Sequence, residues 1–139
     1  MSLNPTLNSP VNPTPGATRA IVFFAHGSRD PLWQAPMHAI AERAQTLDPA
    51  RIVRLAYLEL CTPSLPDVVA QLANSGVAEC AIMPLFLGMG RHAREDLPAL
   101  LDQLRSAHPG MKFDLLPALG EDSRLIELAA RMAVFPAQP

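Results

Sequence analysis

The chain has 139 residues, which is enough for one domain of ordinary size and too few for two. Its formal net charge is -2 with both signs dispersed along the sequence, so we expect no nucleic-acid partner, because such binders normally carry a basic face. No apolar run is long enough to cross a bilayer and no secretory signal is recognisable, so we expect no membrane association and a cytoplasmic location.

The sequence divides into a tail, one domain and a second short tail. Residues 1–19 are rich in Pro, Asn, Ser and Thr without an apolar period, which predicts a disordered tail. Residues 20–134 form the predicted domain, and 135–139 follow as a C-terminal tail. Strands are expected at 20–25, 52–58, 81–87 and 113–116. Helices are expected at about 33–47, where Pro36 should delay the start, and at 65–76, 97–107 and 123–134.

This alternation of strands and helices predicts the fold class. A strand that is followed by a helix and then by another strand implies a right-handed crossover onto a parallel sheet, with helices on both faces. We therefore expect a three-layer αβα domain with a four-stranded, mainly parallel sheet. The expected strand order is 2-1-3-4, as in flavodoxin-like sheets.

The stretch 81–98, AIMPLFLGMGRHAREDLP, combines a buried strand, a glycine-containing loop and the start of a helix. Pro98 fits a first helical turn, and Asp96 is a candidate cap, so the helix is expected to begin after His92. This places His92 on the loop. Ligands of open parallel sheets bind at the carboxyl ends of the strands, where such loops gather.

Three residues with metal-binding side chains occupy equivalent positions in successive units. His26, Glu59 and His92 each follow a predicted strand, and 33 residues separate each from the next. One βαβ unit takes roughly 30 residues or more, so each interval equals one structural unit. The pattern predicts that the three side chains could meet on one divalent transition-metal ion, with coordination positions left open for substrate. The same residues could also accept protons near neutral pH.

Three arginines accompany these residues. Arg29, Arg91 and Arg94 are expected beside the loops, where a guanidinium group could bind a carboxylate or a phosphate of a substrate. The same side chains could equally be solvated surface charges.

Other patterns carry less information. Residues 88–93 match the dinucleotide pattern G-x-G-x-x-G/A, but Asp114 falls within the next predicted strand instead of after it, which disfavours a dinucleotide site. No Walker-type phosphate loop occurs in the sequence. Cys61 and Cys80 lack metal-finger or redox spacing and are interpreted as small core or loop residues.

The segments HGSRDP, YLELCTPSLP and PLFLGMGRHAREDLP, in this order, resemble the short, single-domain sirohydrochlorin chelatases. Members of this class II chelatase family insert cobalt or iron into a tetrapyrrole without ATP, in cobalamin or siroheme biosynthesis. The resemblance covers about 20–134. It implies metal-binding and catalytic roles for His26 and His92, with Glu59 as the matching acidic residue.

The resemblance also implies the substrates and the assembly. Co²⁺, Fe²⁺ or Ni²⁺ would be a substrate together with sirohydrochlorin, no tightly bound cofactor is expected, and a chain this short would form a homodimer. The glycine loop would admit a large flat ring. Candidate substrate-binding residues are Ser28, Arg29, Gly88, Gly90, Arg91 and Arg94.

Two other functions stay open at this point. A non-enzymatic carrier could use the same three ligands to hold a metal ion or a tetrapyrrole. Phosphoryl transfer through His26 is disfavoured, because the chain lacks an arginine directly before this histidine in the manner of histidine phosphatases.

Overall fold

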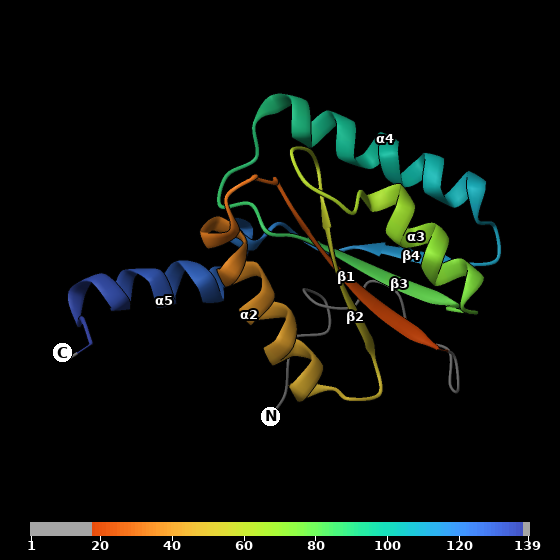
Figure 1. Ribbon diagram of the computed structural model, residues 1–139. Helices are drawn as coiled ribbons and strands as arrows, with labels where there is room; N and C mark the ends of the chain where they lie inside the picture. The colour runs from red at the N-terminus through yellow and green to blue at the C-terminus, as the bar shows by residue number, and fades with distance from the viewer. Residues whose placement is uncertain (1–17, 138–139) are drawn as a thin grey trace.

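The computed structural model describes residues 18–137 and contains one four-stranded parallel sheet with helices on both faces (Figure 1). The strand order β2-β1-β3-β4 confirms the predicted topology. Residues 1–17 of the predicted N-terminal tail, and 138–139 of the C-terminal one, lie outside the described residues. The strands are β1 (Arg19–Ala25), β2 (Ile52–Tyr57), β3 (Glu79–Pro84) and β4 (Lys112–Leu115). The tail boundary at 19 is therefore wrong by one residue, because Arg19 pairs with Glu79 at the start of β1.

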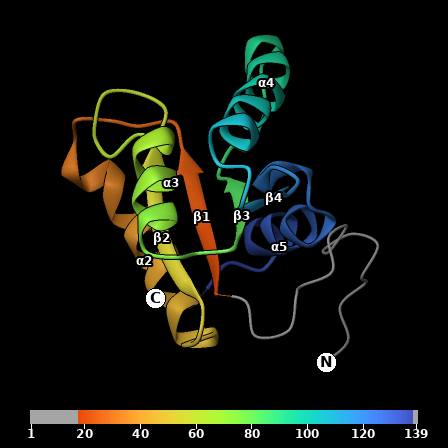
Figure 2. The same cartoon turned by 90° about the vertical axis from the view of Figure 1, so that its right-hand side faces the viewer.

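The helices form the outer layers. They are α2 (Pro31–Leu47), α3 (Leu65–Asn74), α4 (Arg91–Ala107) and α5 (Ser123–Val134), with a 3-10 turn η1 (Leu119–Glu121) before α5. Helices α3 and α4 cover one face of the sheet, and α2 packs on the other face against β1 and β2 (Figures 1 and 2). Among residues 18–137, no helix is long and apolar enough to cross a bilayer.

The main core lies between the sheet and the α3–α4 layer. Alternate residues of the central strands point into it, and the side chains with at most 1% exposure include Val22, Ile82, Leu65, Val69 and Leu101. Burial on both faces explains why the central strands are almost continuously apolar. Burial also raises the pKa of the Cys80 thiol to about 12, so this cysteine is a structural core residue, as predicted.

Two helices begin earlier than the sequence predicts. In each of them a proline that was expected to mark or delay the helix start lies inside the helix. Helix α2 starts at Pro31, where the Asp30 carboxylate accepts a hydrogen bond from the Leu32 N–H at 2.9 Å, and it continues through Pro36. Helix α4 starts at Arg91 after the N-cap Gly90 and contains Pro98.

Burial explains why α4 continues through its proline. Proline removes one helical hydrogen bond, but the apolar face made by Leu97, Leu101 and Leu104 is buried against the sheet and holds the helix together. The prediction that Asp96 caps this helix is therefore wrong, and His92 lies in the first turn of α4 instead of on a loop.

Helix α5 extends away from the sheet and contacts mainly η1 (Figure 1). Its predicted range is confirmed, and it contains no buried residue. Its start is fixed by Asp122, whose carboxylate accepts hydrogen bonds from the backbone N–H of Arg124 at 2.8 Å and from the guanidinium of the same residue. These bonds lower the pKa of Asp122 to about 2.

This lowered pKa predicts how the stability of the α5 start depends on pH. The ionised carboxylate is favoured in the folded chain, so its contribution is present above the unfolded pKa of 3.8 and is lost as the pH falls towards 2. An NMR titration should give a midpoint near 2 for Asp122 and reduced amide protection in the first turn of α5 over the same range. Asp122→Asn should remove the pH dependence of that turn. A midpoint of 3.8 would contradict the hydrogen-bonded cap.

Candidate functional site

A pocket of about 500 Å³ opens at the carboxyl edge of the sheet, between the strand ends and the first turns of α4. Its volume lies within the range of small-molecule sites. Most of its walls are apolar, with Phe24 and Phe86 among them, and His26, His92 and Asp96 add the titratable groups. We call this cavity the histidine pocket.

His26 enters the pocket because it is the first residue after β1. The ladder between β1 and β2 continues past the strand ends, since the Leu58 N–H donates to the Ala25 carbonyl at 2.9 Å and the Glu59 N–H donates to the His26 carbonyl at 3.0 Å. This backbone pairing places the two side chains together. Nε2 of His26 lies 3.0 Å from Oε1 of Glu59, and both side chains are about half exposed.

Gly27 makes this pairing possible. Its φ of +110° lies in a region that favours glycine, and a Cβ atom there would lie 1.8 Å from the carbonyl oxygen of Glu59. Any larger residue would therefore push the Glu59 backbone away from His26. The glycine of the HGSRDP segment fixes the position of the carboxylate relative to the imidazole.

The loop after β3 forms the opposite wall and is held at both ends. The Leu85 N–H donates to the Phe24 carbonyl at 2.8 Å, and the Gly120 N–H of η1 donates to the Phe86 carbonyl at 2.9 Å. A Cβ on Gly120 would lie 1.6 Å from the Leu87 carbonyl oxygen, so only glycine allows this close approach. The loop keeps the Phe86 ring edge-on to the His26 ring at 6.5 Å.

His92 and Asp96 both reach the pocket from α4. They are four residues apart on a helix and therefore share one face. Sequence reasoning missed Asp96 as a pocket residue because it placed the helix start too late. The spacing of four would have identified it once the helix was known to begin at Arg91.

The structure brings the three predicted ligands only partly together. His26 and Glu59 are in contact, and His26 and His92 line the same pocket. Across residues 18–137, no three His, Cys, Asp or Glu side chains are grouped closely enough to hold one metal ion. Joint coordination of one ion by all three residues stays a prediction.

Gly88 and Gly90 line the histidine pocket, as predicted, whereas Ser28 does not. A Cβ on either glycine would meet nothing within 4 Å, so these glycines leave open space beside the pocket instead of allowing a tight turn. Ser28 instead stabilises the loop before α2, where its Oγ accepts a hydrogen bond from the Asp30 N–H at 3.0 Å.

The three arginines have different surroundings, and none lines the histidine pocket. Arg29 is exposed on the loop before α2. Nε of Arg91 lies 3.2 Å from Oε1 of Glu95, one turn further along α4, in an exposed ion pair. Arg94 lines a separate cavity on the β4 side of α4.

A protein-family model for CbiX matches residues 20–133, which is most of the chain. The chain belongs to the CbiX family. The family predicted from three sequence segments is thereby confirmed. A curated relative, the sirohydrochlorin cobaltochelatase of Methanopyrus kandleri, is 34% identical over 82 residues, which are 59% of this chain and 57% of that protein. The chain thus spans little more than half the length of this relative.

Solved structures show the same fold. The putative cobalamin (vitamin B12) biosynthesis CbiX protein from Marinobacter aquaeolei VT8 superposes with a TM-score of 0.71 and 35% identity, covering 84% of this chain and 93% of that one. The sirohydrochlorin chelatase SirB from Bacillus subtilis subspecies spizizenii, in complex with cobalt, gives a TM-score of 0.70 at 24% identity, covering 85% and 51%. The latter similarity concerns the fold alone.

The geometry of Gly27 gives a prediction for stability. Gly27→Ala should lower the free energy of unfolding by about 2 kcal/mol or more, because the new methyl group overlaps the Glu59 carbonyl and the backbone at positive φ is strained. Gly88→Ala is the matched control and should change it by less than about 0.5 kcal/mol, since its Cβ enters open space. Urea unfolding measures both values. Equal effects would contradict the role given to Gly27.

Proposed function

We propose that this CbiX-family protein inserts Co²⁺ or Fe²⁺ into sirohydrochlorin without ATP. The observation that carries the proposal is that two histidines from different βα units line one largely apolar pocket, with a carboxylate bonded to the first of them. The name of the Methanopyrus kandleri relative supports the choice of reaction, and the lack of a Walker-type phosphate loop agrees with an ATP-independent mechanism.

The chemistry requires ligands for the ion and acceptors for protons. A dication replaces the protons of two pyrrole N–H groups, so two protons leave the ring and no oxidation state changes. An imidazole can bind a transition metal or accept a proton near neutral pH. We assign both tasks to His26 and His92, with the metal ion as substrate.

Glu59 acts on the reaction through His26. When neutral His26 donates its Nε2 proton to Oε1 of Glu59, the lone pair stays on Nδ1, where it can bind the ion or take a ring proton. The carboxylate then stabilises the imidazolium that forms. We also propose that Glu59 can join both histidines as a ligand of the ion. Its carboxylate would then no longer accept the Nε2 proton of His26, because an ion on Nδ1 lies at a different edge of the imidazole ring.

The other pocket walls suit a flat, mainly apolar ring. Phe24, Phe86 and Leu100 provide apolar surface, and Gly88 and Gly90 leave space beside it. Asp96 stands one helical turn from His92 and can hold a proton or balance the charge of the ion.

We place the reaction in the cytoplasm, as a step of cobalamin or siroheme biosynthesis. Cys61 and Cys80 are free thiols, and free cysteines are typical of reducing compartments. Cys61 is only partly buried, so an oxidising compartment would expose it to reaction.

Replacement of either histidine tests the proposed reaction. His26→Ala and His92→Ala should each lower the rate of cobalt insertion by about a hundredfold or more, because general acid–base groups contribute about 10²–10⁴ and the metal ligand is lost as well. The assay follows the absorption spectrum of sirohydrochlorin with Co²⁺ under anaerobic conditions. His38→Ala, at an exposed position on α2, is the matched control and should insert cobalt normally.

Two results would contradict this assignment. Near-normal turnover by His92→Ala would show that metal insertion does not take place in the histidine pocket. Tight binding of sirohydrochlorin by the unsubstituted protein, with insertion no faster than in buffer, would instead support the carrier alternative.

Thermal unfolding should be nearly unchanged in all three variants, because His26, His38 and His92 are exposed.

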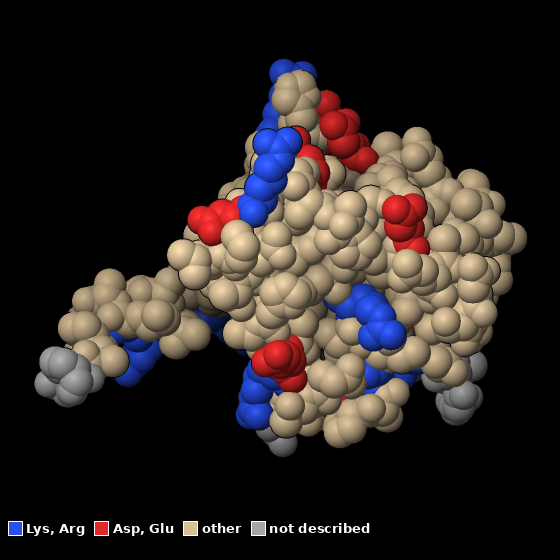
Figure 3. Space-filling model, in the orientation of Figure 1, with Lys and Arg blue, Asp and Glu red and all other residues tan. Residues whose placement is uncertain are grey.

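We also propose that the working protein is a homodimer joined through α5. This helix is amphipathic, and its apolar side chains, including Leu128 at 55%, Met132 at 63% and the adjoining Phe135 at 66% exposure, lack cover from the rest of the described chain. The projecting helix is mostly uncharged on the face seen in Figure 3. An apolar helical face is normally buried against another element, and a two-fold dimer supplies the same patch from both copies.

A charge on the apolar face of α5 tests the dimer. Met132→Lys should shift the mass measured by light scattering from dimer to monomer, because it would bury an unpaired ammonium group in the contact. Glu127→Lys introduces the same group on the polar face of α5 and should leave the dimer intact. A monomeric unsubstituted protein at micromolar concentration, or a dimeric Met132→Lys, would contradict the proposal.

A further inference from the structure

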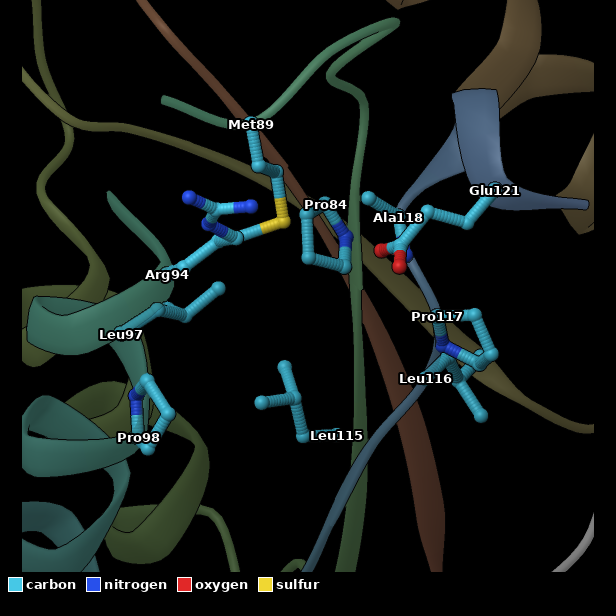
Figure 4. Close-up of a pocket in the computed structure, with 10 residues that line it drawn as sticks. All are labelled: Pro84, Met89, Arg94, Leu97, Pro98, Leu115, Leu116, Pro117, Ala118 and Glu121. Carbon is cyan, nitrogen blue, oxygen red and sulfur yellow. The ribbon is translucent and has the colours of Figure 1, made fainter. Parts of the chain in front are cut away.

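A second cavity of about 350 Å³ lies on the other side of α4 from the histidine pocket, between the first turns of this helix and the segment that joins β4 to η1 (Figure 4). We call it the Arg94 cavity. Leu97 lines both cavities, so the two cavities are neighbours along α4. The walls of the Arg94 cavity are formed mainly by proline and leucine side chains, among them Pro84, Pro98 and Leu115.

Among residues 18–137, two charged side chains line this cavity, and the first is Arg94. Its guanidinium group lies beside Met89 in Figure 4, and it makes no hydrogen bond or ion pair with any residue from 18 to 137. Arg91, one turn earlier on the same helix, is paired with Glu95. Arg94 is exposed, so its guanidinium keeps all its donors available for a ligand that enters this cavity.

The second charged side chain, Glu121, lies on the opposite wall (Figure 4). Its Oε1 accepts a hydrogen bond from the Ala118 N–H at 3.1 Å, and this bond fixes the carboxylate at the end of η1. An anionic group is therefore favoured near Arg94 and disfavoured near Glu121. A ligand with one negative charge would therefore bind with that charge directed towards Arg94 and away from Glu121.

The chemistry of the walls defines the ligand class. A cavity with mainly apolar walls and one exposed, unpaired guanidinium among its lining residues suits a short aliphatic chain with a terminal carboxylate. Under the proposed function, the substrate carries acetate and propionate arms around its rim. A ring centred in the histidine pocket would have its edge at α4, and the Arg94 cavity opens on the far side of the first turns of that helix.

We propose that the Arg94 cavity receives one carboxylate arm of the tetrapyrrole and that Arg94 is a specificity-determining residue for it. This inference rests on the proposed function. Arg94 binds and orients the rim of the ring, while the ion and the protons are handled in the histidine pocket. Its loss should therefore weaken substrate binding without slowing the chemical step.

Binding and turnover of three variants test the inference. Arg94→Gln should raise both the Kd of metal-free sirohydrochlorin, measured by its fluorescence, and the KM for insertion by about tenfold, with kcat unchanged, because a charge-assisted hydrogen bond is lost. Arg43→Gln, at an exposed position on α2 whose side chain lines neither cavity, is the matched control and should change the Kd by less than about twofold. Glu121→Gln should bind at least as tightly as the unsubstituted protein, because it removes a repulsive charge and keeps the acceptor oxygen.

The methyl-esterified ring provides the decisive comparison. It lacks carboxylate charges, so Arg94→Gln and the unsubstituted protein should bind it equally well. Equal effects of Arg94→Gln and Arg43→Gln on sirohydrochlorin, weaker binding by Glu121→Gln, or an equal loss of affinity of Arg94→Gln for the ester would each overturn the inference. Failure of the proposed function itself would look different, because the unsubstituted protein would then insert neither cobalt nor iron.

Discussion

The close approach of Gly27 to the Glu59 carbonyl is the constraint on which the site depends. Parallel strands bring chain segments to one edge of a sheet, but they do not by themselves place side chains within hydrogen-bonding distance. Here the ladder between β1 and β2 runs on past the strand ends, and it can do so only where no Cβ stands between them. The imidazole–carboxylate pair follows from this backbone arrangement, and Gly120 has the corresponding role for the loop after β3.

The sequence was sufficient for the strand order and for the positions of His26, Glu59 and His92 at one edge, because apolar runs and βαβ spacing are set by burial and chain length. It was insufficient for the start of α4. Pro98 and Asp96 are local start signals, and the buried face of the helix overrides them. Because the start of α4 was placed too late, the sequence analysis did not identify Asp96 as a pocket residue.

Tertiary surroundings of individual side chains could not be predicted from sequence either. Arg91 and Arg94 are equivalent in a sequence pattern, since both flank His92 in the same stretch. Both are exposed, but a helix turns them to different sides, so that Arg91 pairs with Glu95 whereas Arg94 lines a cavity with mainly apolar walls. Likewise, the helical range of α5 was predicted correctly from the sequence, which could not indicate that this helix would project from the sheet.

The half-exposed state of the His26–Glu59 pair has a consequence for how strongly its two groups attract each other. In the free chain, water surrounds both groups and weakens their attraction, because the Coulomb energy falls in proportion to the dielectric constant. A flat ring lying across the pocket would act as a lid of low polarity over them. A covering ring would thus strengthen the attraction between the Glu59 carboxylate and a positive charge held beside the His26 imidazole.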